Sequence, residues 1–410
     1  MKIFKITTAY PLYLNKFYAK HPELTIKSYA EQKASLDYDA FSWPDFWSNA
    51  LTPLGYEMME VTANIQSMQT AWAKENGVKF KKHNWIQNIA FEQVKKFQPT
   101  VLFVQDYVTF SSQWLRELKQ SCSSIKLILC WVGSAIPKTD LFKNVDLLLS
   151  CAPESIEYFR RVGFRAEHLN HAFDFRINSR LESKCEKFDF SFIGQIIPQD
   201  QFHLKRQELL EEILELTPVD IFSPSADLNW RDRLNYGLKQ GIVIATKGLK
   251  NMRISDSTLS RIPVISKAAK WNEVPSYSAI NNPIKFYLKP SVFGLEMYQT
   301  LLESKATLNI HADSSPIYAS NMRLFEATGV GTCLVTDWKK NISELFEPDK
   351  EVVIYKSAEE CIDKVKWLLD RPQERKAIAK AGQDRTLKDH TFAQRAVQFD
   401  EIIKKELEVR

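Results

Sequence analysis

The chain of 410 residues contains no run of about 18 apolar residues, which is the length that a membrane-spanning helix requires. Its first six residues, from Met1 to Ile6, mix apolar with basic side chains and predict a strand. They are too short and too charged to form a signal peptide. The sequence therefore predicts a cytoplasmic protein, and peripheral contact with a membrane stays open.

Cysteines are few and scattered, and none of the six forms a Cys-x-x-Cys pair. Several lie in apolar runs, which favours buried free thiols over disulfides or zinc ligands. The six positions are Cys122, Cys130, Cys151, Cys185, Cys333 and Cys361.

Blocks of like charge are absent, because 55 basic and 50 acidic residues alternate along the chain. The net charge of +5 is only mildly basic. No nucleic-acid partner is predicted, since the chain lacks the basic arm that such a partner requires. A weak attraction to anionic membranes or anionic substrates stays open.

What the chain does contain is a regular alternation of apolar strands and helical segments. Its 410 residues exceed the usual size of one core, so two domains are expected. Helical patterns at 85–97 and 155–162 separate the strands of the first half, which is typical of a parallel sheet covered on both faces. Those strands are predicted at 2–8, 56–62, 100–105, 125–132, 146–150 and 166–170.

The polar, aperiodic segment 178–188 predicts a linker between an N-terminal domain at 1–177 and a C-terminal domain at 189–390. Four prolines leave the elements of 241–290 unplaced. The fold class predicted is α/β, with two Rossmann-like domains facing a cleft. In the second domain strands are predicted at 189–194, 219–222, 307–311, 331–336 and 352–355, and helices at 203–216, 358–369, 372–387 and 392–407.

The most informative stretch is 320–331, which predicts a short helix, a glycine stop and then a strand. Ser320 or Asn321 is placed to cap the helix start, where free backbone N–H groups favour a phosphate. Arg323 and Glu326 lie three apart and project from one face. A cation suits a diphosphate and a carboxylate suits a ribose diol, so a nucleotide-sugar site is predicted. The alternative is a surface ion pair on an ordinary amphipathic helix.

Further motifs follow in a fixed order at 189–194 with 205–210, 308–311, 321–329, 344–346, 378–382 and 390–395. Together they resemble glycosyltransferases of the two-Rossmann-domain type called GT-B, in particular the spore-maturation-like or group 1 family. The similarity covers most of residues 189–400 and is looser in the N-terminal half. It implies that the last helix, in 391–410, crosses back to pack on the N-terminal domain.

The resemblance also implies that the C-terminal domain binds a nucleotide-diphosphate sugar. Glu326 matches the family glutamate that holds the ribose hydroxyls, and Gly194 matches the glycine of the first strand-to-helix loop. The other implied contacts are the backbone of Ser320, Asn321 and Met322 and the charge of Arg323 for the diphosphate, and Asn309 and His311 for the sugar. Arg253 is a spare cation that could approach the diphosphate, although such a residue is more often a solvated surface charge.

One departure from the family pattern bears on the mechanism. Many retaining relatives carry a second glutamate eight positions before the ribose-binding one, and here that position is Tyr318. Asp313 lies nearby in the same loop. The missing acidic pair favours inversion over retention.

An inverting transfer needs a base on the N-terminal side of the cleft. Asp106 directly follows the predicted strand 100–105 and fits best, although an aspartate there also commonly caps a helix. Asp45 and His21 are further candidates, and His171 is predicted to line the cleft as a second catalytic residue beside Asp106. His168 and His171 lie three apart without a third ligand at recognisable spacing, so no metal is predicted.

The sequence thus predicts a glycosyltransferase that moves a hexose-type sugar from a nucleotide-diphosphate donor to a glycan, lipid-linked or small acceptor. Inversion without a cofactor is expected. Two alternatives stay open, namely a nucleotide-sugar epimerase on the same scaffold and a non-catalytic nucleotide-sugar-binding protein.

Overall fold

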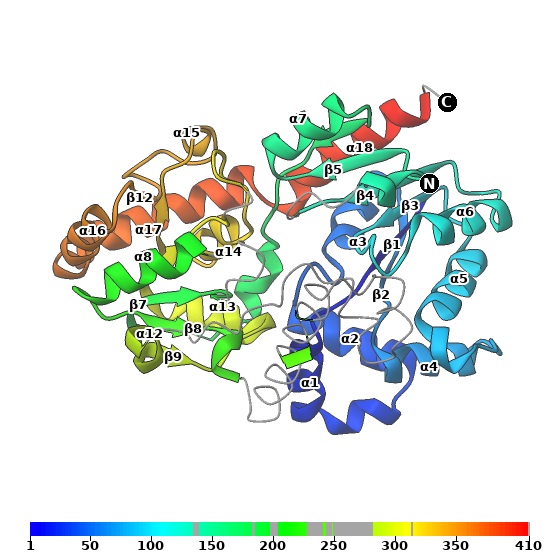
Figure 1. The fold of residues 1–410 in the computed structure, drawn as a ribbon, viewed down its shortest axis with the longest axis horizontal. Helices are drawn as coiled ribbons and strands as arrows, with labels where there is room; N and C mark the ends of the chain where they lie inside the picture. The colour runs from blue at the N-terminus through cyan, green and yellow to red at the C-terminus, as the bar shows by residue number, and fades with distance from the viewer. Residues whose placement is uncertain are drawn as a thin grey trace.

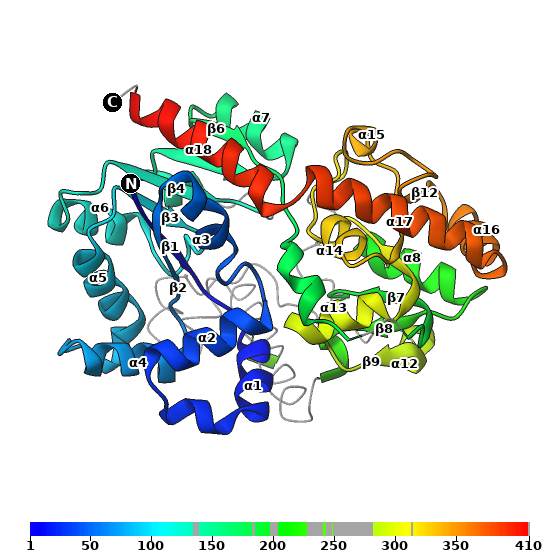
Figure 2. The same cartoon turned by 180° about the vertical axis from the view of Figure 1, so that it is seen from behind.

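Two α/β units lie side by side, each built on its own sheet, and the last helix of the chain lies on the first unit (Figure 1, Figure 2). The computed structural model describes residues 1–133, 139–182, 185–196, 204–227, 282–312 and 315–408, together with 241–242 and 248. None of the helices in this part of the chain has the length and apolar character needed to cross a membrane.

Six parallel strands form the first sheet, namely β1 (Lys2–Thr7), β2 (Glu57–Thr62), β3 (Val101–Val104), β4 (Leu127–Trp131), β5 (Leu147–Ser150) and β6 (Ala166–His168). They lie in the order β2-β1-β3-β4-β5-β6. Every residue of β3, β4 and β5 is buried. Strands that are apolar on both sides need cover on both faces, and helices supply it.

The helices of the first unit are α1 (Pro11–Lys20), α2 (Tyr29–Asp39), α3 (Phe46–Leu51), α4 (Gln66–Glu75), α5 (Trp85–Phe97), α6 (Ser112–Ser121) and α7 (Pro153–Arg161). Short 3-10 turns are η1 (Pro22–Ile26), η2 (Thr52–Leu54), η3 (Lys82–Asn84), η4 (Thr139–Phe142) and η5 (Phe175–Arg180). The helix predicted at 85–97 is α5, and the one predicted at 155–162 is α7.

The second sheet is also parallel and six-stranded, with β7 (Phe188–Ile193), β8 (Asp220–Phe222), β9 (Leu288–Lys289), β10 (Ser304–Asn309), β11 (Cys333–Asp337) and β12 (Val353–Tyr355). The order is β12-β11-β10-β7-β8-β9. Its helices are α8 (Leu204–Leu214), α12 (Asn282–Tyr287), α13 (Gly294–Leu302), α14 (Arg323–Gly329), α15 (Ile342–Leu345), α16 (Ala358–Asp370) and α17 (Pro372–Asp389), with the turn η6 (Pro224–Asp227).

The predicted α/β class with two Rossmann-like units is confirmed, and every predicted strand is present with ends shifted by a few residues. The strand β9 was not predicted, because two residues beside a proline give no periodic signal. The boundaries proposed for the linker and the two domains stay predictions.

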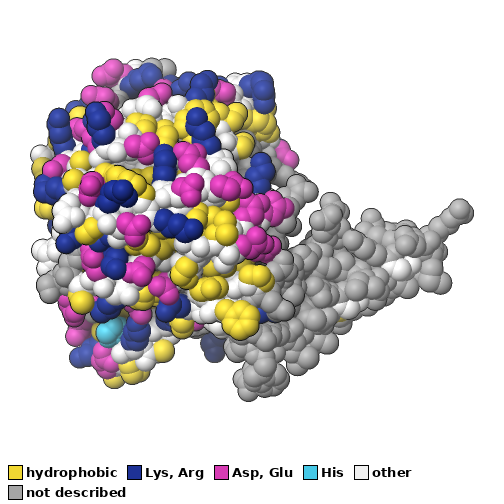
Figure 3. Space-filling model, turned by 90° about the vertical axis from the view of Figure 1, so that its left-hand side faces the viewer, with side chains coloured by type: hydrophobic (Ala, Val, Ile, Leu, Met, Phe, Trp, Pro, Cys, Tyr) yellow, Lys and Arg dark blue, Asp and Glu magenta, His cyan; other side chains and the backbone are white. Residues whose placement is uncertain are grey.

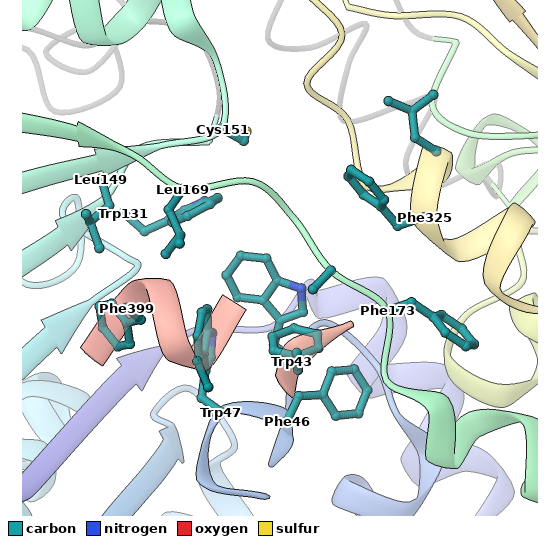
Figure 4. Close-up of a cluster of buried hydrophobic side chains, with 14 of the residues drawn as sticks. Trp43, Phe46, Trp47, Trp131, Leu149, Cys151, Leu169, Phe173, Phe325 and Phe399 are labelled. Atoms are coloured by element: carbon teal, nitrogen blue, oxygen red, sulfur yellow. The ribbon is translucent and has the colours of Figure 1, made fainter. Parts of the chain in front are cut away.

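Two segments cross between the units at one place. The backbone N–H of Phe173 donates to the carbonyl of His390 at 2.9 Å, and that of Phe392 donates to the carbonyl of Phe173 at 3.1 Å. The helix α18 (Phe392–Glu408) then packs on α3, where Phe399 lies 4.9 Å from Trp47 between ring centroids (Figure 4). The predicted return of the last helix to the first unit is therefore confirmed.

One hydrophobic cluster continues through this crossing. Figure 4 shows Trp43, Trp47 and Phe399 on the side of the first unit and Phe325 on α14 of the second, with Phe173 on the segment between them. Gly329 keeps this junction tight, because a Cβ at that position would overlap the ring of Phe173. The two units are thus joined by packed side chains as well as by the chain itself.

The surface of the second unit, seen from the outer side in Figure 3, carries basic and acidic side chains interspersed with each other. The described residues on this face therefore form no uniformly charged surface.

A buried imidazole, that of His390, lies at the same crossing. Its Nδ1 is 2.9 Å from a guanidinium nitrogen of Arg395, and its Nε2 is 2.9 Å from the carbonyl oxygen of Leu345. Since Arg395 can only donate, the ring is neutral, with Nε2 carrying the proton. Burial, assisted by the charge of Arg395, lowers the pKa of His390 to about 4.

The free energy of unfolding is expected to decrease as the pH falls from 6.5 toward 4. In this range His390 binds a proton in the unfolded state but stays neutral in the folded state. At pH 5 this penalty is about 2 kcal/mol relative to neutral pH. Urea unfolding at pH 7.5 and pH 5 measures it, and His390→Gln should reduce the difference between the two pH values by about that amount. The exposed His83→Gln is the control, and an equal pH dependence in both variants would refute the assignment.

Candidate active site

A cleft of about 740 Å³ lies between the two units, at the carboxyl ends of both sheets. The chain connections leave in opposite directions between β1 and β3 in the first sheet and between β7 and β10 in the second. Ligands of such sheets bind at these switch points. Residues at the ends of all four strands line the cleft, namely Thr8, Asp106, Ile193 and Asn309.

The ion pair predicted on α14 forms, but it lies in the cleft wall and not on the outer surface. A guanidinium nitrogen of Arg323 is 2.9 Å from Oε2 of Glu326, and the two side chains are 15% and 8% exposed. Both residues line the cleft. Their location favours the ligand-binding interpretation, because a plain surface ion pair would be solvated.

Glu326 is held by two partners. Arg323 contacts one oxygen, and the hydroxyl of Tyr298 on α13 donates a hydrogen bond to the carboxylate. Burial raises the pKa of Glu326, while Arg323 and Tyr298 oppose that rise. The carboxylate is therefore a buried acceptor whose ionised form depends on both neighbours.

A chain of amides fixes the start of α14 against the second sheet. Asn321 donates to the amide oxygen of Asn309 at 2.7 Å, and Asn309 donates to the hydroxyl of Thr336 at 2.9 Å. Among the described residues, Oδ1 of Asn321 and Nε of Arg323 are buried without a hydrogen-bond partner. The second unit therefore offers one hydrogen-bond acceptor and one hydrogen-bond donor without partners, on residues two positions apart that line the cleft.

The prediction that Ser320 or Asn321 caps α14 is wrong. The N-cap is Met322, which has helical dihedral angles, and no side chain caps the helix. Asn321 Nδ2 donates to Asn309, and its Oδ1, the atom that would accept from the helix start, has no partner among the described residues. Ser320, Asn321 and Met322 nevertheless all line the cleft, so their predicted contact with the diphosphate stays a prediction.

Three residues predicted to bind the donor are not found among the described residues that line the cleft. His311 does not line the cleft, since its Nδ1 pairs with Asp337 at 2.6 Å beside the end of β10. Gly194 directly follows β7 and does not line the cleft, and a Cβ at this position would crowd the ring of Phe192. Arg253 lies outside the described residues, and so does Asp313.

The position of Tyr318 is fixed from the other unit. The carboxylate of Glu154, in the first turn of α7, accepts the backbone N–H groups of Ile317 and Tyr318 at 3.1 and 3.0 Å. The loop that precedes α14 is therefore anchored to the first unit, and Glu154 is already committed to this contact.

Asp106 lies in the opposite wall of the cleft, after β3. Its Oδ1 accepts the backbone N–H groups of Val108 and Thr109 at 3.1 and 2.8 Å, and its Oδ2 accepts the hydroxyl of Thr8 at 2.7 Å. The carboxylate therefore shapes the loop, but it does not cap the following helix, because α6 is capped by Ser111. These contacts also hold it rigidly at the cleft.

His171 lies between two indole rings, with centroids 5.2 Å from Trp43 and 5.3 Å from Trp131, and all three residues line the cleft. Burial, assisted by Arg395, lowers the pKa of His171 to about 3, so the ring is neutral near pH 7. Its Nδ1 and the indole N–H of Trp43 are buried without partners among the described residues. A neutral imidazole with so low a pKa is a weak base, so His171 suits a binding role better.

The loop that carries Trp43 is strained. Ala40, Ser42 and Trp43 have φ of 60°, 62° and 67°, in the left-handed region that residues other than glycine rarely adopt. All three line the cleft. Strain of this kind is typical of ligand-binding loops, where surrounding contacts enforce it.

The remaining candidates have structural partners elsewhere. Asp45 forms a two-pronged ion pair with Arg176 at 2.9 Å, and His21 follows α1 outside the cleft lining. His168 contacts the carbonyl of Cys151 and does not join His171 in a ligand set. In the described part of the chain, no group of three or more His, Cys, Asp or Glu side chains could hold a metal ion.

The six cysteines are all free thiols. Five of them are buried, as predicted, whereas Cys185 is exposed.

Sequence reasoning missed Tyr298 and Met297 on α13 and gave no role to Trp131. A signal for α13 was present in the helical spacing of Leu295, Tyr298 and Leu302. That spacing does not reveal that Tyr298 meets Glu326, because the two residues are 28 positions apart in the sequence.

The chain is similar to known proteins in part of its sequence and in its overall fold. Residues 245–401 match the family described as glycosyl transferase-like. No curated protein sequence matches the chain.

Three solved structures share the fold over nearly the whole chain. Sucrose-phosphate synthase from Thermosynechococcus elongatus is 8% identical with a TM-score of 0.54, and the match covers 100% of both chains. A glycosyltransferase from Rickettsia africae is 8% identical with a TM-score of 0.53, covering 99% of this chain and 98% of that one. HepE from Anabaena, solved in complex with UDP-glucose, is 12% identical with a TM-score of 0.52, covering 99% and 100%.

Two parallel sheets with a cleft between their carboxyl ends, together with these structural matches, define a GT-B fold protein. Residues 245–401 match the glycosyl transferase-like family, so the predicted similarity to group 1 glycosyltransferases is confirmed.

Proposed function

We propose that the protein transfers a hexose-type sugar from a nucleoside-diphosphate donor to a glycan, lipid-linked or small acceptor. The observation that carries this proposal is a set of unsatisfied polar groups in the walls of one cleft. Among the described residues, Arg323 Nε, Asn321 Oδ1, Trp43 Nε1 and His171 Nδ1 are buried without partners. Buried polar groups are seldom left unpaired in proteins, so a ligand rich in hydroxyl and phosphate oxygens is the expected partner.

The donor belongs on the side of α14. Glu326 can accept two hydroxyls of a ribose, because an ionised carboxylate has about four acceptor positions and its protein partners occupy only some of them. Arg323 supplies charge for the diphosphate, and Asn321 can accept a sugar hydroxyl. In support, the structural relative HepE was solved with UDP-glucose.

The acceptor belongs against the first unit, and we propose that Asp106 is the base. As the acceptor oxygen attacks the anomeric carbon, its proton passes to Asp106 while the bond from that carbon to the diphosphate breaks. Arg323 and the backbone before α14 stabilise the departing negative charge without a metal ion. Attack from the face opposite the leaving group inverts the anomeric centre, and the tyrosine at position 318 supports this assignment over retention.

A thermal-shift screen tests the donor assignment. UDP, ADP and GDP and their hexose conjugates are each added to the protein, and one base is expected to raise the melting temperature by a few degrees. A ligand at about 100 times its Kd stabilises the folded state by about 2.7 kcal/mol. The matching nucleosides, which lack the diphosphate, are the control. If none of the diphosphates shifted the melting temperature, the proposed donor site would be wrong.

A further inference from the structure

The helix α13 contacts both units of the protein beside the cleft. Its first residue, Gly294, and two further residues, Met297 and Tyr298, line the cleft, and it packs against α14. Its first turn lies against the first unit, and its second turn lies against the donor-side ion pair. A single nine-residue helix therefore connects one unit to the carboxylate of the other.

Asp39 of the first unit holds the start of α13. It accepts a hydrogen bond from the backbone N–H of Leu295 and another from the hydroxyl of Tyr13 at 2.9 Å. A Cβ on Gly294, whose φ is 54°, would overlap both the carboxylate and the carbonyl of Asp39. Only glycine permits this close approach, so the position of the helix is tied to Asp39.

Two consecutive residues of α13 hold both members of the ion pair on α14. The sulfur of Met297 accepts a hydrogen bond from Arg323 at 3.2 Å, and the hydroxyl of Tyr298 donates to Glu326. Tyr298 is only 3% exposed, and its ring packs 6.2 Å from that of Phe173 at the crossing between the units. The side chain is thus held at its hydroxyl by Glu326 and at its ring by Phe173.

We propose that α13 is the positioning element of the donor site, in which Tyr298 orients Glu326 and Asp39 of the other unit fixes the helix that carries Tyr298. This inference rests on the proposed function. It implies that the first unit affects donor affinity through Asp39, although Asp39 does not line the cleft. Tyr298 and Asp39 are positioning residues, since neither transfers a proton nor bonds to a reacting atom.

The first test is the affinity of Tyr298→Phe for UDP, ADP and GDP, measured by calorimetry. Loss of one hydrogen bond to a charged acceptor is expected to weaken binding of the preferred diphosphate roughly tenfold. Tyr56→Phe is a matched control, because the hydroxyl of Tyr56 also donates to a carboxylate, that of Asp400, at 2.7 Å and away from the cleft. This control should bind like the unmodified protein.

The pH profile separates positioning from a general structural effect. Of the described groups, Arg323 and Tyr298 are those that lower the pKa of Glu326 against its burial. Without the Tyr298 hydroxyl, Glu326 takes up a proton at higher pH, so diphosphate binding should be lost at a higher pH than in the unmodified protein. Equal affinity and an equal pH profile in Tyr298→Phe and the unmodified protein would overturn the proposal.

The second test is Asp39→Ala, which removes the anchor in the first unit and is expected to weaken diphosphate binding about fivefold or more. Lys20→Ala is its control. It deletes another contact to the first turn of α13, the Lys20–Glu296 ion pair, whose side chains are 61% and 51% exposed and which should matter little. If Asp39→Ala does not fold, Asp39→Asn, which keeps the volume, replaces it. Unchanged affinity in the folded Asp39 variant would overturn the inter-unit part.

Failure of this inference differs from failure of the proposed function. If the unmodified protein bound no diphosphate, or if Glu326→Ala bound like the unmodified protein, both the donor site and the inference would fall. If Glu326→Ala weakened binding while the Tyr298 and Asp39 variants did not, only the role of α13 would be refuted.

Discussion

The Glu326→Ala variant is expected to lose sugar transfer by about 100-fold or more, with most of the loss in kcat/KM for the donor. The substitution removes the acceptor proposed for the ribose and leaves the Arg323 charge in a buried wall without its partner. Loss of a buried, charge-assisted pair costs about 3 kcal/mol or more. Initial rates over a range of donor concentrations measure the effect.

The control for this variant is Glu186→Ala. Glu186 also pairs with a buried arginine of the second unit, Arg375, at 3.0 Å, but it does not line the cleft. It should lower stability while leaving the donor kinetics intact. Full transfer activity in a folded Glu326→Ala protein would show that the donor is held elsewhere.

Asp106→Asn is expected to lower kcat by about 10²- to 10⁴-fold, the usual contribution of a general base. The hydrogen bonds of Asp106 allow this variant to separate the loss of the base from a change of the loop. Asparagine keeps the oxygen that accepts from Val108 and Thr109, and the hydroxyl of Thr8 can turn to accept from the new amide. The loop should therefore persist and the diphosphate should bind as before, so that the change falls on the chemical step.

Two further variants test whether Asp106 itself, and neither Thr8 nor His171, accepts the proton. Thr8→Val removes one hydrogen bond to Asp106 without removing the carboxylate, and its effect on kcat should be small. His171→Gln should raise KM for the acceptor more than it lowers kcat, because the neutral ring is assigned a binding role. If Asp106→Asn kept nearly full kcat, Asp106 would be only the loop-shaping residue that its hydrogen bonds already make it.

The sequence predicted the parts of the fold that depend on local pattern. The buried strands β3 and β4 are continuous apolar runs, and α5 has a clear helical period, so each gives its own signal. The cleft could be placed at the ends of strands because parallel sheets bind ligands there. That rule led to Asp106, whereas the contact of Asn309 with the sugar was implied by the resemblance.

What could not be predicted depends on contacts between distant segments. Nothing near Tyr298 in the sequence indicates Glu326, and nothing near Asp39 indicates Gly294. His311 shows the same limit, since the resemblance implied a contact with the sugar, while its ring pairs with Asp337 on the neighbouring strand. The cap of α14 was mispredicted because the N-cap is Met322, one residue after Asn321, whose side chain is turned to Asn309 on the neighbouring strand.

The return of α18 to the first unit has a consequence for how the protein is made. Phe392, Phe399 and Ile403 belong to the same buried cluster as Ile3 and Val101, so the first sheet lacks part of its core until the final helix has left the ribosome. The second unit is synthesised in between and can fold earlier. Synthesis order therefore does not set the order of folding, because β1, which is made before the second unit, is fully packed only after α18 has docked.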